Sequence, residues 1–387
     1  MTNYSDISLT WSSDLTSYSG WAQHARGILK PLLLGGAQIR LELQRPSRPE
    51  ARLDKFWEEK FKILTKCSPG HVKIFHGSIN NIGNNETGGP IVVSTHWETK
   101  DVPNGWLPTL RRKDISSIIV PDDTLRDSLI NHVEKPVYSV PFAIDSNELK
   151  GIHPINLNGL ETNTIVFGVI GQWNNRRNMS DVVVAFLRAF SDKDNVALVI
   201  KTFGNDPVNI EDRKKLIDLI RQIKKDCKKP NLPKIVMLQE ICSYKTMTSL
   251  LSRINIYVSA SRGESKDISM LRCAAMGKQC ILSDNTAHKP IINYNNPAIY
   301  PVSGSEEPVM LSNGPYDILD SWFRSDSIML SEQMHKAYID LLLHGEDTRS
   351  NLKKLKSNIR SDYHPDTVAS KFAKVLRKIS LPMVELT

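Results

Sequence analysis

Glu264 is the acidic residue best placed in this sequence to bind a ligand. It stands in a small polar segment, residues 259–266, between an apolar run at 254–258 and a run capped by Asp267 and ended by Gly277. These three segments predict a buried strand, a loop and a helix. Parallel sheets bind ligands at the carboxyl ends of their strands, and a helix start attracts phosphate. We therefore expect a polar ligand at Glu264, although an ordinary βαβ unit would give the same pattern.

A pair of arginines offers the positive charge that a phosphorylated ligand needs. Arg176 and Arg177 follow a fully apolar run, residues 164–170, and Lys201 closes a second apolar run at 196–200. A guanidinium group has a planar fork of N–H donors that holds phosphate oxygens in pairs. Because both runs predict strands, we expect these cations at strand ends, with Arg176 and Arg177 against phosphate. The alternative is an arginine pair on the surface with no ligand.

Two residues of the first half could act on the same kind of ligand. Gly20 lies in a polar loop, residues 18–21, where a glycine lets the backbone approach a ligand closely. His96 follows a strand predicted at 90–94, and an imidazole there could hydrogen-bond a hydroxyl or steer a proton. A plain turn and a structural histidine are the alternatives.

The elements that would position these residues alternate between strand and helix. In the first half, strands are predicted at 7–11, 39–43, 72–75, 90–94, 115–121 and 137–141, with helices at 21–34 and 122–133. This order indicates a Rossmann-like α/β domain over residues 1–145. The polar stretch 146–163 contains glycine and proline and has no sustained period, so it is predicted to be a linker.

The second half repeats the alternation over residues 164–364. Further strands are predicted at 234–238, 280–282 and 298–302, and helices at 180–190, 210–224, 244–253, 332–343 and 346–363. A last helix, within 365–387, has Val368, Phe372 and Leu376 on one apolar side. The repeated alternation predicts a second doubly wound domain with a parallel sheet.

The segment around Glu264 resembles the donor-site motif of family 4 glycosyltransferases, which are retaining enzymes of the GT-B fold. That motif is a glutamate, seven residues, a second glutamate, and a helix of small residues ending in glycine. Glu264 falls on the first glutamate, Ala274–Gly277 on the helix end, and Arg272 on the second glutamate. The resemblance extends over nearly the whole chain, since residues 142–145 match the family's end of the first domain, with Ala143 in place of glycine.

The resemblance implies two Rossmann-like domains facing a cleft and a sugar transfer from a nucleotide-sugar donor. It places Arg176 and Arg177 on the donor phosphates and Glu264 on sugar hydroxyls. Gly20, Lys201 and Arg272 complete the expected donor-binding set, and His96 joins Glu264 as a catalytic candidate. It implies retention of anomeric configuration, a last helix that crosses back to the first domain, and no cofactor or metal.

Arg272 leaves a second interpretation of the function open. In the family motif a carboxylate at this position accepts hydrogen bonds from both ribose hydroxyls, whereas arginine has only donors. The chain could be a degenerate homologue that binds a nucleotide sugar without turning it over. The guanidinium could pair with Glu264, hold a phosphate, or point away from the ligand. A third reading is a glycosyltransferase that acts on modified DNA bases. The acceptor class, whether glycan, lipid or modified nucleic acid, is not indicated by any motif.

Charge and composition favour an anionic partner. The net charge is +8 and the pI is near 9.1, which suits nucleotide diphosphates, anionic membrane surfaces or nucleic acid. Five cysteines without paired or zinc-ligand spacing indicate reduced thiols, and no apolar run is long enough for a membrane span. With no signal-peptide pattern at the N-terminus, we expect a cytoplasmic protein, with peripheral membrane contact left open. The pair Asp192 and Asp194 lies between a helix and a strand, away from the expected site.

Overall fold

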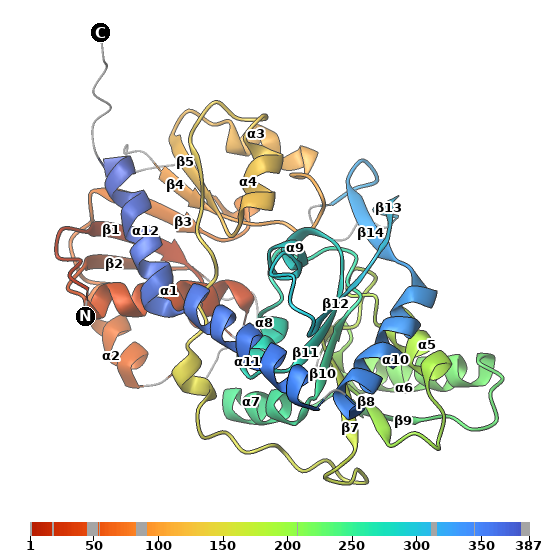
Figure 1. Cartoon of the computed structure of the whole chain (residues 1–387). Helices are drawn as coiled ribbons and strands as arrows, with labels where there is room; N and C mark the ends of the chain where they lie inside the picture. The colour runs from red at the N-terminus through yellow and green to blue at the C-terminus, as the bar shows by residue number, and fades with distance from the viewer. Residues whose placement is uncertain are drawn as a thin grey trace.

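The protein consists of two α/β units, each built on its own sheet (Figure 1). The computed structural model describes residues 2–17, 19–44, 53, 55–82, 91–206, 208–310, 316–343 and 345–380. Both main sheets have six strands, and every strand pair in them is parallel. The predicted fold class of two Rossmann-like, doubly wound units is therefore confirmed.

The first sheet has the strand order β2-β1-β3-β4-β5-β6. Its strands are β1 (Ser8–Ser13), β2 (Gln38–Leu43), β3 (Val72–His76), β4 (Ile91–Ser94), β5 (Ile115–Val120) and β6 (Val137–Ser139). The helices of this unit are α1 (Gly20–Leu34), α2 (Lys55–Leu64), α3 (Leu107–Leu110) and α4 (Asp123–Leu129). The strand order reverses between β1 and β3, so the loops after these two strands diverge there and leave room for a ligand.

The second sheet has the strand order β12-β11-β10-β7-β8-β9. Its strands are β7 (Ile165–Gln172), β8 (Val196–Phe203), β9 (Lys234–Leu238), β10 (Ile256–Ser259), β11 (Gln279–Ser283) and β12 (Ile299–Val302). Its helices are α5 (Met179–Ala189), α6 (Ile210–Asp226), α7 (Tyr244–Arg253), α8 (Ile268–Ala275), α9 (Lys289–Ile292), α10 (Ser327–Leu343) and α11 (Gly345–Asp362). Here the order reverses between β7 and β10. Arg176 and Arg177 follow β7, and Glu264 follows β10.

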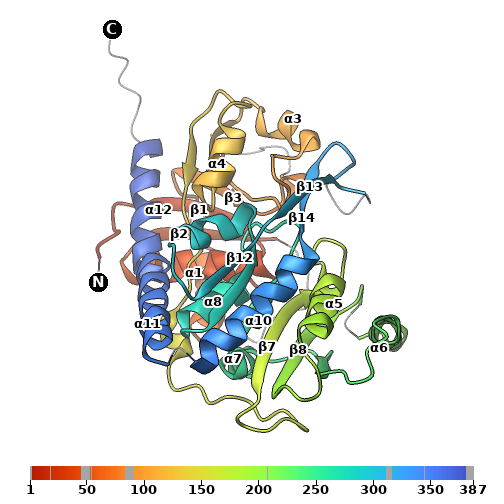
Figure 2. The ribbon, with the colours of Figure 1, turned by 45° about the vertical axis from the view of Figure 1, so that its right-hand side comes forward.

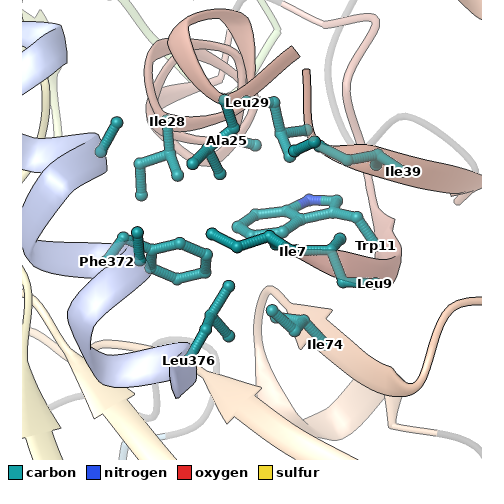
Figure 3. Close-up of a cluster of buried hydrophobic side chains, with 14 of the residues drawn as sticks. Ile7, Leu9, Trp11, Ala25, Ile28, Leu29, Ile39, Ile74, Phe372 and Leu376 are labelled. Carbon is teal, nitrogen blue, oxygen red and sulfur yellow. The ribbon is translucent and has the colours of Figure 1, made fainter. Parts of the chain in front are cut away.

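The helix α12 (Pro365–Ser380) lies on the first unit although it follows the second in the chain (Figure 1). It packs along α1, and the Phe372 ring lies 5.7 Å from the Trp11 ring between their centroids. Figure 3 shows Phe372 and Leu376 pointing into the cluster formed by β1 and α1. The apolar side predicted for this helix therefore completes the core of the first unit.

A hairpin of β13 (Gly304–Pro308) and β14 (Ser321–Ser325) extends from the second unit toward the first (Figure 2). Val309, Tyr316 and Trp322 belong to the same buried cluster as Trp97 and Trp106 of the first unit. The Lys100 amide donates to the Ser321 carbonyl at 3.1 Å. We call the hairpin, with Val309 and Tyr316, the arm. It joins the two units at a place far from the linker, whose first residues form a 3-10 helix, Ser146–Leu149.

Several boundaries differ from the sequence-based expectation. The hydrophobic pattern of the sequence did not predict α2, in which half of the residues are charged. It also did not predict the hairpin, whose first strand is Gly-Ser-Glu-Glu-Pro. Strand β8 continues to Phe203 instead of ending at Ile200, because Lys201 and Thr202 are buried in the ladder. No helix among the described residues is long and apolar enough to span a membrane.

Replacing Phe372 by alanine should destabilise the protein, because the ring is fully buried between α12 and β1. We expect a loss of about 3–5 kcal/mol in the free energy of unfolding. Urea unfolding followed by Trp fluorescence measures it. The exposed neighbour Lys374→Ala should change stability by about 0.5 kcal/mol or less, and an equally small effect of Phe372→Ala would contradict the packing role.

Candidate functional site

The Glu264 carboxylate lies between two guanidinium groups. Nη1 of Arg177 is 2.6 Å from Glu264 Oε1, and Nη1 of Arg176 is 2.9 Å from the same oxygen. The Ser261 hydroxyl donates to this oxygen at 2.8 Å. The Glu264 side chain is only 2% exposed. We call Arg176, Arg177 and Glu264 the Arg–Glu cluster, and the structure brings these three predicted residues together at the strand-order reversal.

Two more carboxylates border the Arg–Glu cluster. Asp267 caps α8 by accepting from the Met270 amide, and its Oδ2 lies 3.7 Å from Arg177 Nη1. Glu98 of the first unit lies 3.6 Å from Arg176 Nη2 and accepts a hydrogen bond from the Tyr316 hydroxyl of the arm. Burial by itself would lower the pKa of Arg176, but the charges of Glu264 and Glu98 outweigh burial and raise that pKa. The Arg176 guanidinium therefore remains charged.

Gly20 begins α1 directly opposite α8. Ser19 caps α1 by accepting from the Ala22 amide at 3.1 Å, and Tyr18 lies outside the described residues. A Cβ on Gly20 would lie 3.5 Å from Ile268 Cδ1, an ordinary contact distance. The start of α1 therefore meets the start of α8, and the two helix N-termini border the same region.

His96 lies in a buried group of rings on the first unit. It stacks on Trp21 with a centroid distance of 3.4 Å and lies near Phe142. Burial is the main cause that lowers the pKa of His96 well below its usual value, and the neighbouring charges of His76, Lys266 and Arg176 act in the same direction. The imidazole is therefore neutral near pH 7 and can accept or donate a hydrogen bond, but it does not carry charge.

A buried ion pair that the sequence did not suggest connects the two units beside the site. Lys266 Nζ lies 3.0 Å from Asp122 Oδ2, and the two side chains are 1% and 6% exposed. Burial would lower the pKa of Lys266, but Asp122 outweighs it and raises that pKa. Lys266 lies two residues after Glu264 in the sequence, but its partner Asp122 lies 144 residues away, so no local pattern predicts the pair.

Lys201 and Arg272 lie outside the Arg–Glu cluster. Lys201 is buried within β8, and burial lowers its pKa, against the smaller opposing effects of Cys242 and Glu240. The Arg272 guanidinium lies 4.4 Å from the centre of the Tyr244 ring, and its Nη2 donates to the Tyr244 hydroxyl at 2.6 Å. The Arg272 side chain therefore does not pair with Glu264, which was one of the three arrangements considered for it.

No family model and no curated protein matches this sequence. Among solved structures, a glycosyltransferase from Rickettsia africae superimposes with a TM-score of 0.66 at 11% identity, over 96% of this chain and 98% of that one. Anabaena HepE in complex with UDP gives 0.63 at 10% identity, over 96% and 100%. A UDP-forming trehalose-phosphate synthase from Burkholderia xenovorans gives 0.64 at 11% identity, over 99% and 100%. The chain has the GT-B fold of these glycosyltransferases.

The buried histidines should make stability fall in mild acid. Nε2 of His76 contacts the Trp21 carbonyl at 3.2 Å, and Nδ1 contacts the Ser94 hydroxyl at 2.9 Å. Burial lowers the pKa of His76 from 6.5 to about 4, so the unfolded chain binds a proton first as pH falls. The contribution of neutral His76 to the free energy of unfolding is therefore fully present above pH 6.5. As the pH falls from 6.5 to 4, about 3 kcal/mol of this contribution is lost.

Urea unfolding at a series of pH values tests this. The His76→Gln variant should show a flatter dependence between pH 6.5 and 4 than the parent, whereas substituting the exposed His132 by Gln should leave the slope unchanged. An identical slope in the parent and His76→Gln proteins would show that His76 is not held neutral.

Proposed function

We propose that this protein transfers a sugar from a nucleotide-sugar donor to an acceptor hydroxyl. The observation that carries the proposal is the Arg–Glu cluster at the strand-order reversal of the second sheet. It lies beside the N-terminus of α8, and the N-terminus of α1 borders the same region from the other unit. Two guanidinium groups and two helix starts form a site for a diphosphate. The comparison with glycosyltransferase structures, one of them in complex with UDP, supports a nucleotide donor.

Sugar transfer breaks the bond between the anomeric carbon and the diphosphate, so negative charge grows on the leaving group. Arg176 and Arg177 would stabilise that charge, because fixed donors act strongly where water is excluded. For the diphosphate to reach them, the guanidinium groups must turn part of their hydrogen bonding from Glu264 to phosphate oxygens. Glu264 then keeps both groups oriented and has lone pairs for sugar hydroxyls.

His96 is the candidate for contact with a substrate hydroxyl on the side of the first unit. Its neutral imidazole can accept a hydrogen bond from that hydroxyl. We also propose retention of the anomeric configuration and a cytoplasmic location, for which the support is the resemblance and the unpaired cysteines of the sequence. The acceptor remains open among glycans, lipids and modified nucleic acid.

A binding protein without turnover is the second candidate. It would be favoured by the observation that all three carboxylates near Arg176 and Arg177 already contact them. An ion pair between Arg272 and Glu264 would also have favoured a protein without turnover, but the Arg272 side chain donates to Tyr244 instead. Slow release of nucleoside diphosphate from a donor sugar, without acceptor, would distinguish an active site from a binding site.

Arg177→Ala should weaken donor binding and lower the transfer rate together. A charge-assisted contact to phosphate is worth about 1.5–3 kcal/mol, or roughly 10- to 150-fold in affinity. A thermal-shift screen of nucleotide sugars identifies the donor first, since ligand at 100 times its Kd adds about 2.7 kcal/mol of stability. Titration of the matching nucleoside diphosphate then compares Arg177→Ala with Arg221→Ala, an exposed control. Equal affinities would remove the phosphate role of Arg177.

Chelation should leave activity largely intact, because we propose that the arginines and helix N-termini replace a metal ion. Within the described ranges no group of three or more His, Cys, Asp or Glu residues could hold a metal. Transfer or donor hydrolysis is measured with and without EDTA. Complete loss in EDTA, restored by manganese or magnesium, would overturn the metal-independent mechanism.

A further inference from the structure

Glu98 approaches the Arg–Glu cluster from the first unit, in the loop that follows β4. Its Oε1 lies 3.6 Å from Nη2 of Arg176, which is longer than a hydrogen bond. Nη1 of Arg176 already contacts Glu264 at 2.9 Å and the Gly263 carbonyl at 2.7 Å. Within the described ranges Nη2 takes part in no hydrogen bond. A phosphate oxygen and the Glu98 carboxylate would therefore compete for this end of the guanidinium group.

The Tyr316 hydroxyl of the arm holds Glu98 where it lies. It donates to Glu98 Oε2 and accepts from the Glu98 amide at 2.9 Å, so its proton and a lone pair are both used on one residue. Burial is the main cause that raises the pKa of Tyr316 well above its usual value, and the charge of Glu98 adds to it, so the phenol keeps its proton. The ring packs in the same buried cluster as Trp97 and Trp322, which fixes the hydroxyl in place.

The backbone of Glu98 is also held, so only its side chain is able to turn. A Cβ on Gly263 would lie 1.6 Å from the Glu98 carbonyl oxygen, which shows that the loops of the two units touch there backbone to backbone. Two residues later, the Lys100 amide is bound to the arm through the Ser321 carbonyl. The Glu98 side chain is 28% exposed, and its carboxylate lies between the Tyr316 hydroxyl and Arg176.

We propose that Tyr316 is a positioning residue for the sugar transfer: it holds the Glu98 carboxylate away from Arg176 and so keeps Nη2 available to the donor diphosphate. The inference rests on the proposed function. Without the hydroxyl, Glu98 Oε2 would lose its partner, while a guanidinium group lies 3.6 Å from the other oxygen. A partly buried carboxylate needs hydrogen-bond partners, so it would turn to Arg176 and compete with phosphate there.

Two single variants should change phosphate affinity in opposite directions. The probes are inorganic pyrophosphate and the nucleoside diphosphates UDP, ADP, GDP and CDP, and isothermal titration of the full chain gives each Kd. Glu98→Gln keeps the shape of the side chain and removes its charge, so it should bind pyrophosphate roughly 5-fold more tightly. Tyr316→Phe keeps the buried ring and releases Glu98, so it should bind pyrophosphate roughly 5-fold more weakly.

The double variant decides whether Tyr316 acts through Glu98. With no charge at position 98, Glu98→Gln should rescue the affinity that Tyr316→Phe loses, to within about 2-fold of Glu98→Gln alone. A purely structural role of Tyr316 would lower the affinity by the same factor with either residue at position 98, and that result would overturn the inference. Tyr316→Met, which fills the space with a flexible apolar side chain, replaces Tyr316→Phe if the latter does not fold.

Matched controls come from a tyrosine and a glutamate in similar surroundings. Tyr300 is a buried tyrosine of β12 whose hydroxyl donates to Asp340 at 2.9 Å, and Glu307 is a partly buried carboxylate of the arm that pairs with Arg262 at 2.5 Å. Tyr300→Phe and Glu307→Gln should each change the Kd for pyrophosphate by less than about 2-fold. A gain in Glu307→Gln equal to that in Glu98→Gln would indicate a general charge effect and overturn the competition.

Unchanged or weaker binding of pyrophosphate by Glu98→Gln would also overturn the inference, because Glu98 would then not oppose phosphate at Arg176. In that case the parent protein still binds its nucleoside diphosphate, and the proposed function stands. If neither pyrophosphate nor any of the four nucleoside diphosphates binds to the parent protein, the donor site itself is contradicted, and this inference with it.

Discussion

The Glu264 carboxylate is withdrawn from water, and its charge is compensated by two guanidinium groups and one hydroxyl. A buried charge without such partners costs several kcal/mol, so the loops after β7 and β10 must stay where they supply them. Backbone contacts follow the same interface, since the Arg262 amide donates to the Arg176 carbonyl at 2.7 Å. The edge of the second sheet at which Glu264 lies is thus held in place by the protein's own contacts.

The charge around this carboxylate also bears on how the diphosphate of the proposed donor would enter. Arg176 and Arg177 contribute two positive charges, against one negative charge each from Glu264, Asp267 and Glu98. The surroundings are therefore not positive as they stand, and an anion gains most if the guanidinium groups exchange carboxylate for phosphate. Glu98 belongs to the first unit and is held by Tyr316 of the arm, so this exchange is coupled to how the two units meet.

The parts of the site that sequence patterns could predict are those whose signal is local. Glu264, Arg176 and Arg177 each follow an apolar strand closely, and parallel strands bring such residues to one edge. The buried pair of Lys266 and Asp122, and the pairing of Glu98 with Tyr316, join residues far apart in the chain, and no local pattern reports such partners. The position of the Arg272 side chain depends on its hydrogen bond to Tyr244. The sequence pattern correctly predicted that a helix starts at Tyr244, but it could not predict this contact.

The arrangement of α12 has a consequence for how this chain is made. Trp11, Ile28 and Leu29 belong to elements that leave the ribosome first, but the core they form also contains Phe372 and Leu376. While residues 365–380 are still unsynthesised, that apolar face has no cover from its own chain. The first unit can then reach its finished core only after the second has been translated, so the usual order of domain-by-domain folding during synthesis cannot be completed here. A chaperone that binds exposed apolar surface would meet this protein on the face that α12 later covers.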